Sequence, residues 1–227
     1  MPSSELPLAS QPIHFAATVV PLRPAAATPE ILLLQRSAAL VFYGGAWVFP
    51  GGRVDPEDGD PQRELLETSK RAAVRELAEE AGLEVGPDGL VLISRWLTPP
   101  GRARRFDTLH FVAEMQPDAA VRIQASEVSD FRWITAAHAL QLHAQGELEL
   151  PPPTFVTLTQ LAPLRSIQEV RTVLGAAPHH YIPRPHSVPG GHVYLYAGDA
   201  GYESGDLSAA GARHRLHVFD RRWHYER

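Results

Sequence analysis

Residues 75–83 are Arg-Glu-Leu-Ala-Glu-Glu-Ala-Gly-Leu, and this stretch decides more about the fold than any other part of the chain. Apolar residues in and before it, among them Leu66, Leu77 and Ala81, recur at helical spacing and predict an amphipathic helix with one buried face. Gly82 follows the last apolar position of that face, where a C-terminal glycine commonly ends a helix.

Three glutamates lie close together on the predicted helix. Glu76, Glu79 and Glu80 stand at positions i, i+3 and i+4, so their carboxylates are neighbours on its surface and repel one another. A hard divalent cation, which prefers oxygen ligands, would turn this repulsion into coordination. The ordinary alternative is a solvated helix face, because paired glutamates are common on helix surfaces.

Composition narrows the class of protein. A chain of 227 residues with 44% apolar and 21% charged residues predicts a globular protein, with one domain and extensions favoured over two equal domains. The net charge of -5 disfavours a general nucleic-acid binder, and the lack of cysteine excludes disulfides and thiolate metal sites. Without an apolar run of membrane-spanning length or signal-peptide features, a cytoplasmic protein without a membrane partner is expected.

The remaining pattern mixes strands and helices, which predicts an α/β sandwich. Strands are expected at residues 13–22, 31–35, 47–49, 90–97, 108–115 and 131–134, helices at 136–144, 155–161 and 167–174, and two tail strands at 192–196 and 214–219.

Residues 75–83 resemble the second half of the Nudix box of the Nudix hydrolases. Glu67 lies eight residues before Arg75, as that box requires. The front of the box departs from the pattern, because the position six residues before Glu67 holds Pro61 instead of glycine, and a Pro-Gly-Gly sequence lies earlier, at residues 50–52.

This departure implies an insertion inside the box. The chain from Gly52 to Arg75 is nine residues longer than the family pattern, and the insertion is expected within residues 54–66. If the box is counted forward from Gly52 instead of backward from Arg75, Glu57 is a competing match for the box glutamate.

The resemblance implies hydrolysis of a pyrophosphate bond with Mg²⁺ or Mn²⁺, which neutralises phosphate oxygens and positions water. It makes Glu76 and Glu80 metal ligands and Glu79 a further ligand or the base that takes the water's proton. Gly51 would offer a backbone carbonyl to the metal, and Arg75 would pair with a box carboxylate and fix its orientation. The implied fold is a Nudix α/β/α sandwich with a mixed β-sheet over residues 12–163, with a C-terminal extension at 164–227 packed on it.

A second resemblance concerns the substrate. Residues 32–40, Gly45 and residues 49–52 resemble the motif that precedes the box in coenzyme A-cleaving Nudix enzymes, including the branch with an interrupted box. The chain departs from that motif at Leu34, Val41 and Trp47.

A cluster of basic residues is also compatible with coenzyme A as the substrate. Arg102, Arg104 and Arg105 form the densest basic cluster, which suits a ligand with several phosphates such as coenzyme A, while a solvated turn that pairs with surface carboxylates is the alternative. The residues expected to bind substrate are Arg36, Gly52, Arg104 and Arg105.

Glu127 and the histidines of the tail are further residues of types that can bind a metal. Glu127 resembles a glutamate that approaches the metals from a loop in some Nudix enzymes, and a surface charge at a strand end is its alternative. The histidines of the tail match no standard ligand spacing, so no second metal site is assigned.

The expected function is therefore hydrolysis of coenzyme A or acyl-coenzyme A to 3′,5′-ADP and a phosphopantetheine. ADP-ribose or a nucleotide sugar is the alternative substrate, and a non-catalytic module that senses a nucleotide is the alternative class. A non-catalytic module would be expected to lose these carboxylates, so the presence of Glu76, Glu79 and Glu80 argues against that alternative. The expected partner is a small-molecule nucleotide, and the oligomeric state stays open, a homodimer included.

Overall fold

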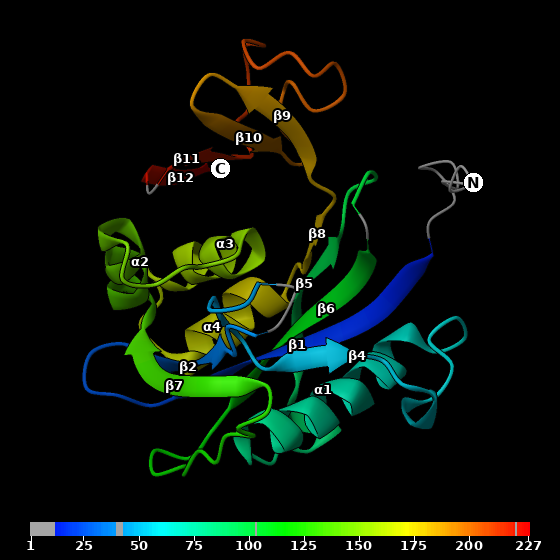
Figure 1. The fold of residues 1–227 in the computed structure, drawn as a ribbon, viewed down its shortest axis with the longest axis vertical. Helices are drawn as coiled ribbons and strands as arrows, with labels where there is room; N and C mark the ends of the chain where they lie inside the picture. Colours follow the sequence, from blue (N-terminus) through cyan, green and yellow to red (C-terminus); the bar gives the residue numbers. More distant parts are fainter. Residues whose placement is uncertain (1–11, 40–42, 103, 221) are drawn as a thin grey trace.

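A computed structural model describes residues 12–39, 43–102, 104–220 and 222–227 (Figure 1). Val41, one of the departures from the coenzyme A motif, lies outside these residues. In the described part of the chain, no helix is both long and apolar enough to cross a membrane.

A mixed β-sheet forms the centre of the molecule. Within the described residues its order is β3-β2-β1-β6-β5-β8, and β4 pairs with β1 while β7 pairs with β2. Its strands are β1 (Ile13–Arg23), β2 (Glu30–Arg36), β3 (Trp47–Val48), β4 (Gly51–Arg53), β5 (Val91–Leu97), β6 (Arg105–Glu114), β7 (Val128–Thr135) and β8 (His179–Tyr181). Strands β1 and β6 run parallel through the middle of the sheet, while β1 and β4 are antiparallel.

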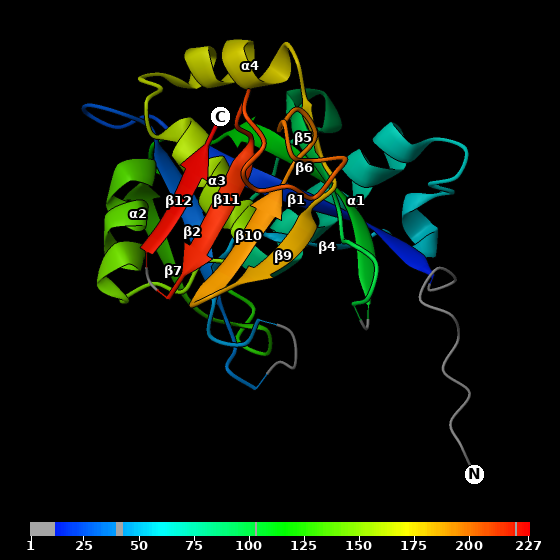
Figure 2. The same ribbon diagram turned by 90° about the horizontal axis from the view of Figure 1, so that it is seen from above.

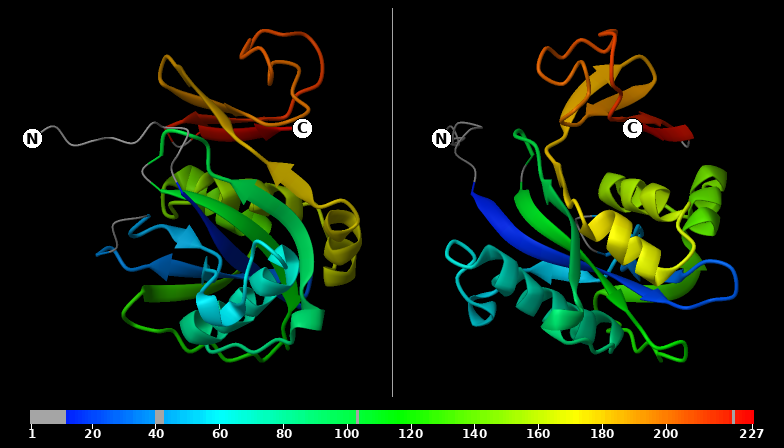
Figure 3. Two further views of the ribbon diagram at one scale, coloured as in Figure 1. Left: turned by 90° about the vertical axis from the view of Figure 1, so that its right-hand side faces the viewer. Right: turned by 180° about the vertical axis from the view of Figure 1, so that it is seen from behind.

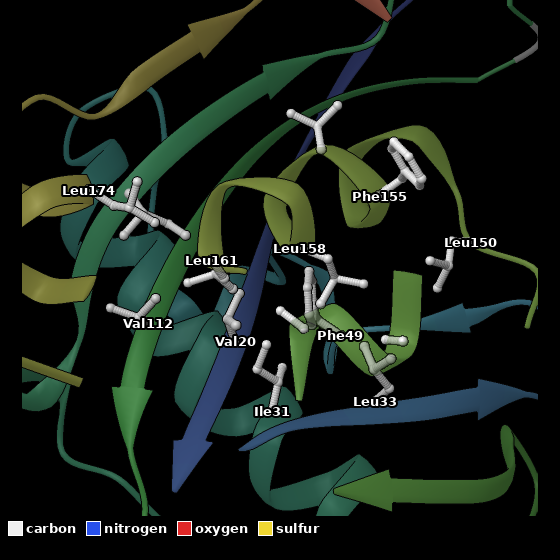
Figure 4. Close-up of a cluster of buried hydrophobic side chains, with 14 of the residues drawn as sticks. Val20, Ile31, Leu33, Phe49, Val112, Leu150, Phe155, Leu158, Leu161 and Leu174 are labelled. Atoms are coloured by element: carbon white, nitrogen blue, oxygen red, sulfur yellow. The ribbon is translucent and has the colours of Figure 1, made fainter. Parts of the chain in front are cut away.

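Helices cover both faces of this sheet (Figure 3). Helix α1 (Leu65–Ala81) lies on one face, and α2 (Ala136–Gln145), α3 (Pro152–Leu161) and α4 (Ile167–Gly175) lie on the other. The run of leucines in β2 follows from this arrangement, because alternate side chains point to opposite faces and both faces are buried. Leu32 and Leu34 pack with α1, whereas Ile31 and Leu33 pack with α3, as Figure 4 shows for the second pair.

The C-terminal part adds a small antiparallel sheet of β9 (Arg184–Val188), β10 (Gly191–Leu195), β11 (Arg215–Phe219) and β12 (Arg222–Glu226) (Figure 2). It packs on α2 and α3 through Trp223, whose ring lies 4.8 Å from that of His143 and 5.3 Å from that of Phe155. Tyr196, which follows β10, meets Trp96 of the main sheet edge to face at 5.8 Å. The small sheet therefore shares the core that α2 and α3 form with the main sheet.

The predicted α/β sandwich and its long elements are confirmed. Helix α1 ends at Gly82, which has φ 65° and donates its amide to the carbonyl of Ala78. One detail of the predicted helix is wrong: Leu66 is 41% exposed, because it lies at the solvent side of the first turn. The division at residue 163 stays a prediction, although β8, which lies beyond it, pairs with β5 of the main sheet.

Candidate functional site

The candidate site lies where α1 faces the turn into β4. Glu80 is 5% exposed, and its Oε2 accepts a hydrogen bond of 2.8 Å from the amide of Gly51. A Cβ added to Gly52 would stand only 2.1 Å from Oε1 of Glu76. The Pro-Gly-Gly turn thus packs directly against two carboxylates of the helix, an approach that only glycine at position 52 permits.

Burial and crowding change the acidity of these carboxylates. Burial raises the pKa of Glu80 to about 7; the Gly51 amide and Arg36 act to lower it, and Glu76 and Glu127 act to raise it. Burial also raises the pKa of Glu76, against the lowering effect of Arg75. A divalent cation bound beside these carboxylates would stabilise their charged forms, which burial disfavours.

Arg75 connects the helix to the loop before it. Its Nη1 donates to Oε1 of Glu76 at 2.9 Å and to Oε2 of Glu79 at 3.3 Å. On its other side, Nη2 donates to Oδ2 of Asp58 at 2.9 Å, and Nε donates to Oδ1 of Asp58 at 3.3 Å. The hydrogen bond with Asp58 is the largest cause of the raised pKa of Arg75.

The two candidates for the box glutamate lie in different places. The Glu67 side chain is 53% exposed and lies 3.6 Å from Lys70 Nζ. Glu57, 73% exposed, lies 3.7 Å from Nε of Arg75. The structure therefore places Glu57 and the unpredicted Asp58 beside Arg75 and turns Glu67 toward solvent. Asp58 lies six positions after Gly52, a count that reveals it once aspartate is admitted in place of glutamate.

The loop that carries Glu127 is hydrogen-bonded to α1 and to the residue that follows β2. The amide of Gln124 donates to the carbonyl of Glu80 at 3.3 Å, and the amide of Ser37 donates to the carbonyl of Glu127 at 2.8 Å. Glu127 itself is exposed, and its charge acts on Glu80. The structure thus brings Glu127 near the helix carboxylates.

The basic cluster divides into exposed and buried members. Arg102 and Arg104 are exposed, whereas Arg105 is 9% exposed and donates from Nε to the carbonyl of Thr98 at 3.1 Å. Burial raises the pKa of Tyr43; Tyr194 of the small sheet acts to raise it further, and Arg102 acts to lower it. Groups of the basic loop and of the small sheet therefore both act electrostatically on Tyr43 in the loop before β3.

The oxygen donors of the site suit a hard cation such as Mg²⁺ or Mn²⁺. Glu76, Glu79, Glu80 and Glu127 supply carboxylates, and Gly51 lies against one of them. Within the ranges that the structure describes, no three His, Asp or Glu side chains already form a metal-binding group. Arg75 holds Glu76 and Glu79 here, so coordination requires these side chains to turn.

Comparison with known proteins supplies the family context. The model of the NUDIX domain matches residues 12–152. Putative nudix hydrolase 7 of Caenorhabditis elegans is 26% identical in an alignment 173 positions long that covers 61% of this chain and 57% of the relative. Mitochondrial coenzyme A diphosphatase NUDT8 of Homo sapiens is 33% identical over 132 residues, 58% of this chain and 52% of the relative. The matches thus span little more than half the length of these curated relatives.

A solved structure agrees in fold. The crystal structure of a NUDIX hydrolase from Alicyclobacillus acidocaldarius superposes with a TM-score of 0.65 and 24% identity, covering 74% of this chain and all of that chain (100%).

Proposed function

The chain belongs to the Nudix family, and we propose that it is a metal-dependent pyrophosphohydrolase that acts on a nucleoside diphosphate derivative. The observation that carries the proposal is the contact between the Pro-Gly-Gly turn and α1, in which Gly51 binds the buried carboxylate of Glu80 and Gly52 lies against Glu76. This contact fixes oxygen donors of the helix beside a backbone that a substrate phosphate can approach.

Each residue has a part in the reaction that we propose. Glu76 and Glu80, with the Gly51 carbonyl and Glu127, would hold Mg²⁺ or Mn²⁺. The cation supplies charge neutralisation for the phosphate oxygens and lowers the pKa of a bound water. Glu79, whose side chain is 53% exposed, serves as a further ligand or as the base that accepts the water's proton. Arg75 orients Glu76 and Glu79 through its hydrogen bonds.

The proposed substrate is coenzyme A or an acyl derivative, cleaved to 3′,5′-ADP and a phosphopantetheine. The motif at residues 32–40 and 49–52 supports it, and the curated relative NUDT8 is named a coenzyme A diphosphatase. Exposed Arg102 and Arg104 offer charge-assisted hydrogen bonds to phosphate, with Arg36 and Gly52 closer to the helix. ADP-ribose and nucleotide sugars are the competing substrates.

A hydrolysis screen tests the substrate. The protein is assayed in Mg²⁺ and then in Mn²⁺ with coenzyme A, acyl-coenzyme A, ADP-ribose and nucleotide sugars, and the products are separated by chromatography. Release of 3′,5′-ADP from coenzyme A is expected. Efficient cleavage of ADP-ribose without cleavage of coenzyme A would transfer the proposal to that substrate. Tight binding of a nucleotide with no turnover of any compound would favour the sensing module.

Glu80→Gln tests the mechanism. Glutamine keeps the shape of the side chain and an oxygen that accepts from the Gly51 amide, so the fold should persist. Loss of the ligand charge is expected to lower kcat about 100- to 1000-fold, the usual effect of removing one stabilising group from a transition state. Circular dichroism checks the fold, and turnover in saturating Mg²⁺ measures the loss. Activity equal to the parent would remove Glu80 from the proposed site.

A further inference from the structure

We propose that Asp58, within the segment that interrupts the box, is the residue that positions Arg75 and through it Glu76 and Glu79. The inference rests on the proposed function for its catalytic consequence, while its structural part concerns contacts of this chain alone. Neither Glu67 nor Glu57, the two residues that the sequence pattern offers, has the same relation to Arg75.

The contact between Asp58 and Arg75 uses both carboxylate oxygens. Nη2 of Arg75 meets Oδ2 at 2.9 Å and Nε meets Oδ1 at 3.3 Å, so one edge of the guanidinium is held by two hydrogen bonds. The side chain of Asp58 is 5% exposed and that of Arg75 is 18% exposed. A two-point ion pair with so little solvent holds its geometry better than a surface pair does. Glu57 lies 3.7 Å from Arg75 and Glu67 lies 3.6 Å from Lys70, and both carboxylates are exposed, so these are loose pairs.

The local backbone explains how a short side chain reaches Arg75. Aspartate has one methylene fewer than glutamate, so its backbone must come closer to the helix. A 3₁₀ turn, Pro56–Asp58, achieves this: the Asp58 amide donates to the Asp55 carbonyl at 3.0 Å, and the Asp55 amide donates to Oδ2 of Asp58 at 2.9 Å. Arg71 of α1 donates to the Asp58 carbonyl and fastens the turn to the helix.

Gly59 lets the chain leave this turn. Its φ is 113°, and a Cβ would stand 2.8 Å from Nη2 of Arg71 and 3.0 Å from Cγ2 of Thr68. Residues 60–64 that follow are exposed or half-exposed. The extra residues of the interrupted box therefore begin after Asp58, and the ion pair rejoins the two parts of the box across them.

Asp58 has an electrostatic effect on the helix carboxylates. The guanidinium of Arg75 is shared between Asp58 on one side and Glu76 and Glu79 on the other. With Asp58 neutral, Arg75 would keep only the Arg53 carbonyl and the loose pairs with Asp55 and Glu57 on that side. It would then be drawn more strongly to Glu76 and Glu79 and compete with a cation for them. Loss of such a supporting partner typically costs about 10- to 100-fold in metal affinity or activity.

The test compares Asp58→Asn with Asp58→Glu and with two matched controls, Glu57→Gln and Glu67→Gln. Binding of Mn²⁺ to the protein without substrate is measured by electron paramagnetic resonance, and kcat and KM are measured in Mg²⁺. Asp58→Asn is expected to weaken Mn²⁺ binding about 10-fold or more and to lower kcat more than it changes KM. Asp58→Glu should restore part of both, and the controls should change both less than threefold.

A second measurement separates positioning through Arg75 from a purely structural effect. In an Arg75→Gln background, Asp58→Asn should cause no further loss of Mn²⁺ binding, because its route of action is gone. Should Asp58→Asn fail to fold, Arg71→Gln, which loosens the turn and keeps the carboxylate, is expected to weaken Mn²⁺ binding severalfold. Unchanged Mn²⁺ binding in the folded variant would overturn the proposal, as would equal losses from Glu67→Gln. A parent protein that binds Mn²⁺ but cleaves nothing would refute the proposed function and leave this test intact.

Discussion

Glu76 and Glu80 lie one helical turn apart on α1, and both are held near a backbone turn that leaves them little solvent. A buried carboxylate, Glu80, and a half-buried one, Glu76, repel each other at this spacing, and burial alone disfavours their charged forms. Arg75 relieves Glu76 from one side and Arg36 acts on Glu80 from another. A protein that keeps such a pair has a use for concentrated negative charge, and cation binding is the use that its oxygen donors fit.

The exposed arginines allow a residue-scale test of substrate identity. If Arg104 binds the 3′-phosphate of coenzyme A, Arg104→Ala should impair cleavage of coenzyme A more than cleavage of its 3′-dephosphorylated form. The lost charge-assisted hydrogen bonds exist for only one of the two substrates, and they contribute about 1.5–3 kcal/mol where water is excluded. A ratio of kcat/KM values for the two substrates, in parent and variant, measures the difference.

Arg63→Ala supplies the matched control for this test, because its arginine is 85% exposed in the interrupting segment and pairs only loosely with Asp60. It should leave the ratio unchanged. Equal losses on both substrates in Arg104→Ala would assign the arginine to the pyrophosphate or remove it from the pocket.

Single residues show how far the sequence led and where it stopped. The glutamates of α1 were predictable because helical spacing alone makes them neighbours. The sequence does not predict the role of Asp58, because the box pattern has glutamate at that position. The contact with Arg75 also depends on a 3₁₀ turn, which hydrophobic periodicity does not predict. The sequence places Arg105 in a basic loop with Arg102 and Arg104, because it predicts a strand that begins only at residue 108. In the structure β6 begins at Arg105 and buries its side chain.

At the scale of elements, length accounts for much of what the sequence predicted, although the short strands β3, β10 and β11 were predicted too. Helix α1 and the long strands β1, β2, β5 and β6 carry enough alternation or helical spacing to be recognised. The strands β4, β8, β9 and β12 have three to five residues each and depend on partners elsewhere in the chain. Their existence follows from tertiary pairing more than from local pattern.

The interrupting segment yields an element-scale prediction. Replacing residues 60–63 by Gly-Ser keeps Asp58, Gly59 and Arg71 and removes only exposed or half-exposed positions. Because closure entropy depends weakly on loop length, the free energy of unfolding should change by less than about 1 kcal/mol. Mn²⁺ affinity and kcat should stay at parental values. Chemical denaturation and the Mn²⁺ titration measure these quantities.

A longer replacement, of residues 57–63, serves as the comparison because it also removes Asp58. It should reproduce the losses expected of Asp58→Asn. A raised KM in the shorter replacement would show that the segment covers the substrate, and unfolding of that variant would assign residues 60–63 to the core.

At the scale of the whole molecule, the small sheet is joined to the main fold through aromatic contacts. Trp96 of β5 stacks on Tyr181 of β8 with ring centroids 3.9 Å apart, and Tyr196 meets both rings edge to face. Within the C-terminal part itself, Arg215 of β11 binds Asp199 through two hydrogen bonds of 2.6 and 2.7 Å, with side chains 5% and 0% exposed. We therefore propose that residues 164–227 pack on the catalytic part as one cooperative unit.

Leu216→Ala tests this cooperativity. Leu216 of β11 is fully buried (0% exposed) in the core that Trp96 and Tyr181 share, so its truncation should lower the free energy of unfolding by about 2–5 kcal/mol. Val173→Ala on α4 is the control, because Val173 is 53% exposed and surface substitutions usually change stability by less than about 0.5 kcal/mol. Thermal unfolding is followed by far-ultraviolet circular dichroism and by tryptophan fluorescence. If the molecule is one unit, both signals shift together to lower temperature in a single transition, since unfolding of the small sheet exposes the core beneath it. Two separate transitions, with only one of them moved by Leu216→Ala, would mean that the small sheet unfolds independently of the part that carries the candidate site.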